Sequence, residues 1–398
     1  MTGDPNYSDA SKVYNTIFDH LQYSLWTDIR NAETCALMVT GSLLTTSSNM
    51  TDWIPKVSSK ALFSQSTERR FNRWLENPAI DVVGVYGPQI VRALKSWGEE
   101  RLVIALDTSM LFEKFCLIQL SILYRNRAVP LAWRVIEHES SQVSFGEIAP
   151  LLGVAQGILD AANISHVLLL ADRGFADTNL MRCLTKMKWH YRIRIKSNFK
   201  MYGPEKELIS KIGAVVLEEN EAKFYQGVYL TEEQYGPVCV AFAKPENVKD
   251  CWQVVSSEAS SMSTFEEYGW RFQIEEGFKD TKSGGLNLEG SHLRSAIKLE
   301  RMVIIHAIGM LFSISEGTSI VENGLRRQVD PHWKRGLSYL QIGLRSLNQA
   351  LSRGNLFFKR ILLVPGVDPD PVPLRKGDKT TGIFTLKTFF EFNFFSSA

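Results

Sequence analysis

The sequence predicts an α/β protein in which a mixed sheet is flanked by helical regions. Two observations predict this class. Buried apolar runs that suit strands alternate with helical segments between about residues 101 and 200. In the first hundred residues, and again after Phe265, the patterning is helical instead. With 398 residues and 44% hydrophobic content, the chain is long enough for two or three domains with a large core.

Residues 1–98 are predicted to form a helical domain. Its segments read YNTIFDHLQYSLW, AETCALMVTGSLL and STERRFNRWLENP. Ser66 or Thr67 suits the N-cap of the third segment, and Asn77-Pro78 suits its end. The arginine-rich face of this segment is typical of a DNA-binding domain of the helix-turn-helix kind. A helical cap with solvated charges would explain the same residues.

Residues 99–200 are predicted to form the first part of the central sheet. RLVIALDTS is a buried strand that ends in an acid, and FCLIQLSILY and VPLAWRVIEH read as two more strands around the turn RNRA. The helix FGEIAPLLGVAQGILDAAN, the strand HVLLLADRGF, the helix ADTNLMRCLTKM and the strand WHYRIRIKS follow. This order is compatible with a ribonuclease-H-like mixed sheet, although periodicity alone fits other α/β folds.

The remaining chain is predicted to contain four segments. Residues 201–263 carry the strand-like pieces KFYQGVYL, VCVAFAK and CWQVVSS and form a β-rich insertion. Residues 264–316 form a helix that completes the core, and residues 317–358 form a C-terminal helical region. Residues 359–398 form an irregular tail, with VPGVDPDPVPLRKGDK as a linker and FFEFNFFSSA as an aromatic end.

Three acids are candidates for one metal site. Asp107 and Asp172 each follow an apolar run, and the carboxyl ends of strands are where ligands gather in α/β sheets. Acids at such positions also cap helices and begin turns, so each alone is weak support. Together with Glu275, they would supply three carboxylates for two Mg²⁺ ions about 4 Å apart, which is the arrangement for phosphodiester displacement.

The stretch YGWRFQIEEGFKDTK places polar groups at helical intervals. From Tyr268, the residues Arg271, Glu275 and Lys282 follow at offsets of three, seven and fourteen, which puts all four on one stripe of a continuous helix. Because this stripe is polar, we expect it to face solvent, a groove or a ligand. A helix held by an Arg271–Glu275 ion pair is the plainer interpretation, worth only about 0.3 kcal/mol. Glu276 lies about 100° from the stripe, so Glu275 is the preferred metal ligand.

These residues carry a resemblance to a known family. The sequence resembles bacterial DDE transposases of the insertion-sequence-four type, whose signature is Tyr, two residues, Arg, three residues, Glu, six residues, Lys. Residues 268–282 match all four positions. ALDTS and LLADRGF resemble the first two acid motifs of the family, and HWKRGLSYLQIGLRSLNQAL resembles its C-terminal helix. The resemblance covers roughly residues 35 to 355.

The resemblance implies roles for particular residues. Asp107, Asp172 and Glu275 are implied to be the metal-binding catalytic triad. Tyr268, Arg271 and Lys282 are implied to hold DNA phosphates near the cleaved end, which suits their hydrogen-bond donors. The other candidates for DNA binding are Trp252, which resembles a tryptophan that stacks on an extruded base, and the cations of one strand face, Arg192, Arg194 and Lys196. A core tryptophan and a solvated strand edge are the respective alternatives.

Composition and motifs limit the cofactors and the location that we expect for the protein. The five cysteines are widely spaced without a C-x-x-C motif, so we expect neither disulfides nor zinc, and a cytoplasmic location. We expect no membrane segment, since no apolar run approaches the roughly 18 residues that a span needs. We also expect no nucleotide cofactor, because a Gly-rich phosphate loop is missing. The net charge of +2 says little, but residues 181–200 contain seven Lys or Arg and no Asp or Glu.

The predicted function is cut-and-paste DNA transposition. Mg²⁺, with Mn²⁺ as a substitute, would support cleavage at the element's ends and joining of the 3′ hydroxyls to target DNA. The resemblance implies a hairpin intermediate and a homodimer that bridges two terminal inverted repeats of double-stranded DNA. Two alternatives are a catalytically inactive protein that binds these ends, favoured by the unusual tail after Phe358, and a metal-dependent nuclease without strand transfer.

Overall fold

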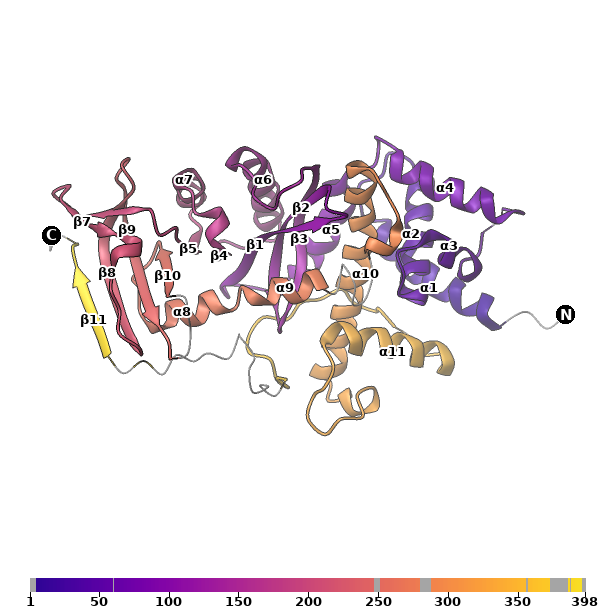
Figure 1. Ribbon diagram of the computed structural model, residues 1–398. Helices are drawn as coiled ribbons and strands as arrows, with labels where there is room; N and C mark the ends of the chain where they lie inside the picture. Colours follow the sequence, from indigo (N-terminus) through magenta and orange to yellow (C-terminus); the bar gives the residue numbers. More distant parts are fainter. Residues whose placement is uncertain are drawn as a thin grey trace.

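A single mixed sheet with helices on both faces organises the protein (Figure 1). The computed structural model describes residues 5–59, 61–246, 251–279, 288–355, 357–372, 386 and 388–395. Five N-terminal helices pack at one end of the sheet, where the long helix α10 joins them (Figure 1). Among the described residues, no helix has both the length and the apolar character needed to cross a membrane.

The N-terminal region is helical, as predicted. Its helices are α1 (Pro5–Leu21), α2 (Ile29–Thr45), α3 (Met50–Trp53), α4 (Ser64–Glu76) and α5 (Val82–Leu94). The predicted N-cap at Ser66 or Thr67 is wrong, because α4 begins at Ser64 and Phe63 holds the cap position. Thr67 is buried, and its hydroxyl donates to Ser59 Oγ instead. Asn77 ends the helix as predicted, with its backbone N–H bonded to the Trp74 carbonyl.

The first half of the sheet contains the five strands that the sequence predicts. They are β1 (Leu102–Leu111), β2 (Phe115–Tyr124), β3 (Arg127–Glu137), β4 (Val167–Ala171) and β5 (His190–Arg194). Their spatial order is β3-β2-β1-β4-β5, in which β1, β4 and β5 are mutually parallel and β2 is antiparallel to both neighbours. The parallel strands are connected by helices α6 (Phe145–Ala161) and α7 (Thr178–Lys186), as a parallel pair requires a crossover.

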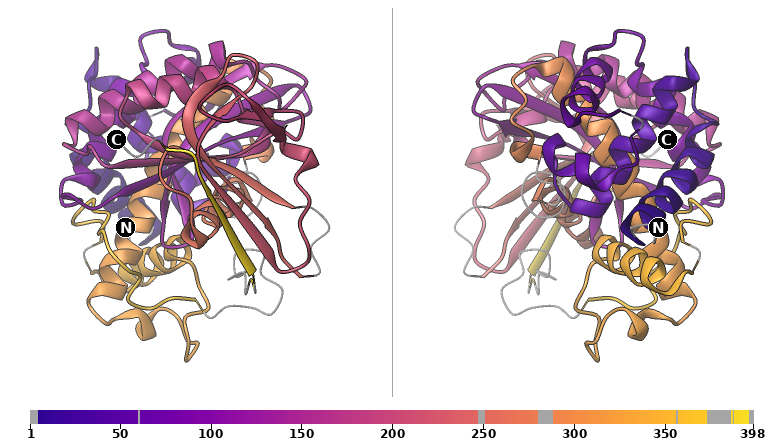
Figure 2. Two further views of the ribbon diagram at one scale, coloured as in Figure 1. Left: turned by 90° about the vertical axis from the view of Figure 1, so that its left-hand side faces the viewer. Right: turned by 90° about the vertical axis from the view of Figure 1, so that its right-hand side faces the viewer.

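The β-rich insertion continues this sheet. Its strands are β6 (Lys200–Tyr202), β7 (Leu208–Lys211), β8 (Glu221–Leu230), β9 (Tyr235–Lys244) and β10 (Trp252–Ser256). Strand β10 pairs antiparallel with β5, and β9 and β8 follow outward (Figure 2). The alternative that β5 forms a solvated edge is therefore wrong, because β5 lies between β4 and β10.

The two faces of the sheet are covered by different helices (Figure 1). On β5, Tyr191 points toward α7, where its hydroxyl lies 3.1 Å from that of Tyr235, which in turn lies 3.1 Å from the Thr185 hydroxyl. Its neighbour Arg192 points the other way, toward α8 (Met262–Gly269). The alternation of apolar and basic residues predicted for this strand thus separates the α7 face from the α8 face.

The helix predicted across YGWRFQIEEGFKDTK is interrupted. Helix α8 ends at Gly269 and α9 (Phe272–Lys279) begins after a turn at Trp270 and Arg271. The turn is tighter than an α-helix, because backbone bonds run from Arg271 N to Tyr268 O and from Ile274 N to Arg271 O, three residues apart. The constant 100° rotation assumed for the stripe therefore fails at Arg271. Lys282 lies outside the described residues, as does the side chain of Glu276.

The C-terminal helices α10 (Ala296–Glu322) and α11 (Tyr339–Arg353) approach each other through two glycines. A Cβ on Gly343 would lie 1.8 Å from the Ser313 carbonyl oxygen, and one on Gly317 would lie 2.1 Å from the Tyr339 carbonyl oxygen. Both obstacles are backbone atoms, which cannot rotate away. The contact between the two helices thus depends on the missing side chains at these positions.

We expect Gly343→Ala to destabilise the protein by about 3 kcal/mol, since α11 must move away from α10 to admit the methyl group. Thermal unfolding followed by circular dichroism measures the loss. Gly157→Ala in α6 is the matched control, because a Cβ there meets nothing within 4 Å. The control should gain roughly 0.5 kcal/mol from reduced chain entropy. Equal behaviour of the two variants would contradict the close approach.

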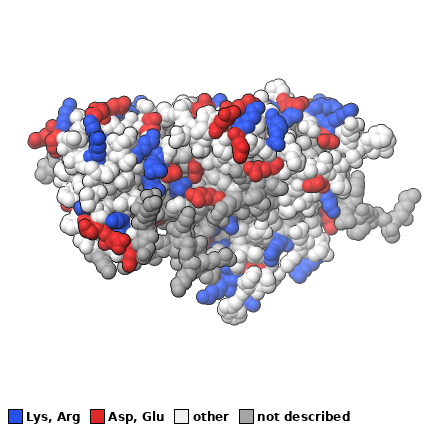
Figure 3. All heavy atoms as spheres, in the orientation of Figure 1, with Lys and Arg blue, Asp and Glu red and all other residues white. Residues whose placement is uncertain are grey.

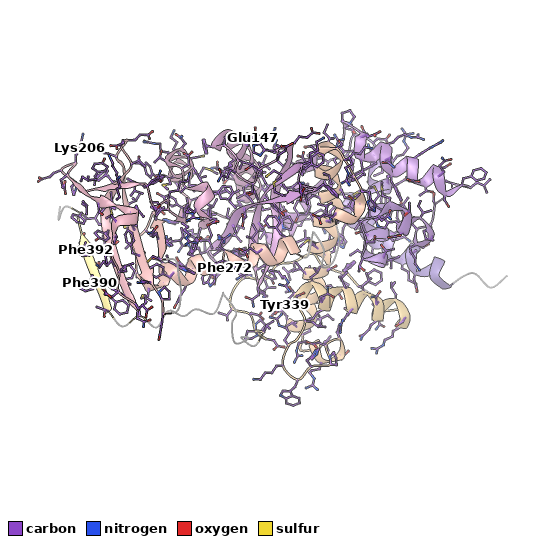
Figure 4. The ribbon with its side chains drawn as sticks, in the orientation of Figure 1. Glu147, Lys206, Phe272, Tyr339, Phe390 and Phe392 are labelled. Carbon is purple, nitrogen blue, oxygen red and sulfur yellow. The ribbon has the colours of Figure 1, made fainter. Side chains whose placement is uncertain are left out.

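The tail is more ordered than predicted. Ile361 and Leu363 are buried in the main core, and Thr388–Asn393 form strand β11, which pairs parallel with β8. The prediction of an irregular tail is therefore wrong for Thr388–Asn393, whereas the segment around Ile361 and Leu363 is irregular but packed. Phe390 and Phe392 lie on this outer strand (Figure 4), where the Phe392 ring stacks on Tyr225 at 4.5 Å between centroids. The alternating aromatic residues of FFEFNF suit a strand, which was not predicted from the sequence.

Candidate active site

Asp107 and Asp172 occupy equivalent positions on neighbouring strands. The parallel pairing of β1 with β4 ends at Leu106 and Ala171, so the two acids are the next residues of each chain segment. Asp107 does not end its strand as the sequence suggests, because β1 continues to Leu111 in its pairing with β2. The strands bring the two acids together where the parallel part of the sheet ends.

Arg271 joins two of the three predicted catalytic acids. Its Nη1 donates to Asp107 Oδ2 at 2.8 Å, and its Nη2 donates to Glu275 Oε1 at 3.2 Å. The side chain of Arg271 is 6% exposed and that of Asp107 is 18% exposed, whereas that of Glu275 is 47% exposed. Asp172 is half-buried, and its Oδ1 accepts from the backbone N–H of Arg173 at 2.6 Å.

Asp107 is the acid whose ionisation the fold opposes most clearly. Burial raises the pKa of its carboxyl to about 6. The Arg271 cation and the backbone N–H of Thr108 lower this pKa, and the negative charges of Asp172 and Glu275 raise it. The charges of Asp172 and Glu275 are thus close enough to affect the pKa of Asp107. The buried guanidinium of Arg271 partly offsets this gathering of negative charge.

Tyr268 and Arg271 are both buried, which contradicts the expected exposure of their stripe to solvent. Tyr268 is 2% exposed, and burial raises the pKa of its hydroxyl to about 12. The Arg271 guanidinium lies 4.9 Å from the ring centroid of Phe272, which Figure 4 places at the start of α9. Among the residues that the structure describes, none accepts a hydrogen bond from Arg271 Nε. Ile274 and Phe278 are also buried, and they anchor α9.

Trp252 belongs to an aromatic group beside Arg271. Its ring packs edge-on against Tyr268 at 5.4 Å and lies 6.2 Å from Phe272. The side chain is half-buried and contacts a small core between β10 and α8. Both interpretations of this tryptophan fit its position, because a half-buried indole supports the core and still presents part of its surface.

The three cations of β5 and its extension have different surroundings. Arg192 is 3% exposed and lies 2.9 Å from Glu258 and 2.8 Å from Glu267. The prediction that it follows DNA phosphates does not fit these buried ion pairs. Arg194 and Lys196 are half-buried, and the positive charge of Arg194 lowers the pKa of Tyr268, which places Arg194 on the side of the predicted site.

A network of ion pairs that was not predicted from the sequence lies beside this site. Arg101 Nη2 donates to Glu258 Oε2 at 2.5 Å, and its Nη1 donates to Glu267 Oε1 at 3.5 Å. Arg101 and Arg192 thus share the same two glutamates. Because partners are separated by up to 166 positions in the sequence, no local pattern could have revealed the network.

The side chains at this site are of the chemical type that binds a divalent cation. Three carboxylates supply the oxygen ligands that Mg²⁺ prefers. Burial is the main cause of the raised pKa of Asp107, and the negative charges of Asp172 and Glu275, which a cation would neutralise, raise it further. Within the described part of the chain, however, no three His, Cys, Asp or Glu side chains are arranged to hold a metal ion. Arg271 contacts one oxygen of Asp107 and one of Glu275, so it would share these carboxylates with a cation or release them.

Comparison with known families assigns part of the chain. Residues 141–312, which are less than half of the chain, match the family described as "Transposase DDE domain". The matched segment contains Asp172, Tyr268, Arg271 and Glu275 and begins after β3, so Asp107 lies outside it. A comparison with curated proteins gives no match.

Proposed function

We propose that this protein is a cut-and-paste DNA transposase of the insertion-sequence-four type. The observation that carries the proposal is the convergence of Asp107, Asp172 and Glu275 around Arg271, within a chain of which residues 141–312 match the transposase DDE domain family. The strand order β3-β2-β1-β4-β5 with β2 antiparallel supports a ribonuclease-H-like core. Under this proposal, residues 1–98 bind DNA, residues 99–200 and 264–316 form the core, and residues 201–263 are its insertion.

Asp107, Asp172 and Glu275 would hold two Mg²⁺ ions, for which Mn²⁺ would substitute. When bound, the ions would activate the attacking oxygen and stabilise the leaving oxygen of a phosphodiester. The chain's own residues set the conditions for this. The partial burial of Asp107 limits the access of water to its carboxyl and strengthens the electrostatic interactions made there. Asp107 and Asp172 directly follow the last paired residues of β1 and β4, Leu106 and Ala171, so the sheet backbone would fix two of the ligands side by side.

Arg271 would take a phosphate in place of a carboxylate when DNA binds. Its guanidinium already makes one hydrogen bond to each of two acids, and its planar fork suits two phosphate oxygens equally well. Tyr268 would help to orient Arg271, because the Arg271 guanidinium lies 5.9 Å from the centroid of the Tyr268 ring. Trp252, Arg194, Lys196 and Lys282 are further DNA contacts in this proposal, as are a hairpin intermediate and a homodimer.

We expect Mg²⁺ to stabilise the protein in the absence of DNA. At a concentration about 100 times its dissociation constant, a ligand that binds only the folded state adds about 2.7 kcal/mol. Differential scanning fluorimetry with MgCl₂ and with EDTA measures this gain as a rise in Tm. Asp172→Asn should remove most of the rise, whereas Asp160→Asn, an exposed acid at the end of α6, should keep it. A rise that survives Asp172→Asn would contradict the assignment of this ligand.

Strand transfer is the activity that distinguishes the proposal from its alternatives. Purified protein is incubated with Mg²⁺, a supercoiled plasmid and a linear fragment that carries its own gene with flanking DNA. Fragment ends joined covalently to the plasmid would support transposition. Cleavage without joined products would support a metal-dependent nuclease instead. Protection of the ends without any cleavage would support a protein that only binds them.

A further inference from the structure

The C-terminal helical region carries an unusual excess of positive charge. From residue 323 to residue 360, the chain contains eight Lys or Arg and only one acid, Asp330, which is fully buried. The surface around α11 therefore shows Lys and Arg side chains at the lower end of the molecule (Figure 3). The exposed cations are Arg327, Lys334, Arg345, Arg353, Lys359 and Arg360. All of them lie beyond residue 312, where the match to the transposase DDE domain ends.

The loop between α10 and α11 is held in one conformation by buried polar groups. Asp330 accepts from the backbone N–H groups of His332 at 3.1 Å and Gly336 at 2.9 Å. Arg326, which is 8% exposed, donates to the carbonyl oxygens of His332 and Trp333, both at 2.8 Å. Because these bonds satisfy the backbone on either side of Trp333, the loop presents this residue with little conformational freedom left to lose.

Trp333 stands at the exposed part of this loop. Its side chain is 80% exposed, and the guanidinium of Arg327 lies 4.7 Å from its ring centroid. The indole contributes little to the core, yet the loop that carries it is firmly held. A flat aromatic surface beside a cation matches the two components of a nucleic-acid strand, since bases and sugars pack on aromatic rings and phosphates attract arginine.

We propose that the loop formed by residues 323–338, together with the exposed cations of α11, is a second DNA-binding surface outside the carboxylate site. Arg327 and Lys334 contact phosphates of a DNA duplex, and Trp333 packs against a sugar or base edge. Arg345 and Arg353, eight positions apart on α11, are separated by about 80° around the helix and extend the positive charge. Asp368 and Asp370 pack against the same loop, where they pair with the buried Arg335 and Arg326 respectively. The exposed charges of residues 323–360 are positive, which favours a polyanion over a second protein, whose surface would carry both signs. The inference rests on the proposed function for the choice of DNA as ligand.

Binding measured without catalysis tests this surface. Full-length protein in EDTA is titrated with a fluorescein-labelled duplex of 30 base pairs, and anisotropy is recorded between 50 and 300 mM KCl. The double variant Arg327→Ala/Lys334→Ala should reduce the slope of log affinity against log salt by about two, since each phosphate contact contributes about 0.9. Trp333→Ala should weaken binding about tenfold and leave the slope unchanged, and Trp333→Tyr should recover most of the loss.

Lys186→Ala/Lys211→Ala is the matched control, because both lysines are exposed and belong to α7 and β7. Its salt slope should equal that of the unmodified protein. Identical slopes for the control and for Arg327→Ala/Lys334→Ala would overturn the inference while the cleavage assay still tests the proposed function. Loss of a protein dimer in Trp333→Ala, with DNA affinity unchanged, would also overturn it and show that the surface binds a second copy.

Discussion

Asp107→Asn is expected to lower the rate of DNA cleavage by at least about 10³-fold, because a metal ligand would be lost and several kcal/mol of transition-state stabilisation with it. Asn keeps the shape of the side chain but cannot ionise, and its NH₂ group replaces one of the two oxygens that accept from Arg271 and Thr108. DNA affinity in EDTA should stay within about twofold of the unmodified value. Single-turnover cleavage of labelled DNA in Mg²⁺ measures the effect, with Asp160→Asn as the control acid. Cleavage at a normal rate would remove Asp107 from the site.

The same substitution should stabilise the metal-free protein at high pH. Burial raises the pKa of Asp107 to about 6 from its ordinary value of 3.8. Folding therefore favours the protonated form, and this contribution is complete below pH 3.8 and is lost as the pH rises through 6. Because a shift of about two pKa units corresponds to about 3 kcal/mol, Asp107→Asn should gain roughly that much relative to the unmodified protein between pH 4 and pH 8. Urea unfolding in EDTA at both pH values measures the difference.

The second large effect is expected from Arg271→Ala, which removes the buried cation between two acids. Cleavage should fall at least about 100-fold, because neither the carboxylates nor the phosphate would be oriented. The metal-free protein should lose about 3 kcal/mol of stability at pH 8, since Asp107 keeps a buried negative charge without its partner. At pH 5, where Asp107 takes up a proton, the loss should be much smaller.

Arg271→Lys separates charge from geometry in this experiment. A lysine keeps the positive charge near Asp107 but cannot donate from two nitrogens to Asp107 and Glu275 at once. Stability at pH 8 should therefore return in large part, while the cleavage rate stays low. Full recovery of cleavage in Arg271→Lys would show that the forked geometry is unimportant. A stability loss for Arg271→Ala that is the same at pH 5 and pH 8 would contradict the coupling to Asp107.

Most of the central sheet was predictable because its strands are short apolar runs between clear turns. Arg125 and Asn126, which separate β2 from β3, both have positive φ, and they form the turn that RNRA indicates. The clean alternation in WHYRIRIKS likewise predicted which residues of β5 face each side. In these segments the local pattern and the tertiary contacts agree, so periodicity is sufficient.

The site was only partly predictable, because its decisive contacts join distant segments. The sequence predicted that Asp107, Asp172 and Glu275 form one site. The assumption of a continuous helix, however, placed Arg271 on an exposed stripe. The turn at Trp270 and Arg271 changes the rotation between α8 and α9, so the helical periodicity no longer applies. Arg271 is instead buried by its ion pair with Asp107, which is 164 positions away in the sequence. Strand β11 was missed for a different reason, since the alternating aromatic residues of FFEFNF suit a strand but were interpreted as part of an irregular tail.

Metal-dependent cleavage by Glu275→Gln tests the central claim most directly. Glu275 is 47% exposed and shares only one hydrogen bond with Arg271, so its substitution should leave the fold intact. Glu266→Gln, another exposed glutamate, lies on α8 and serves as the matched control. A fragment carrying the protein's own gene and flanks should be cut at fixed positions in Mg²⁺ by the unmodified protein and by the control, but not by Glu275→Gln. Cleavage of the same positions by Glu275→Gln would contradict a catalytic site built on these three acids.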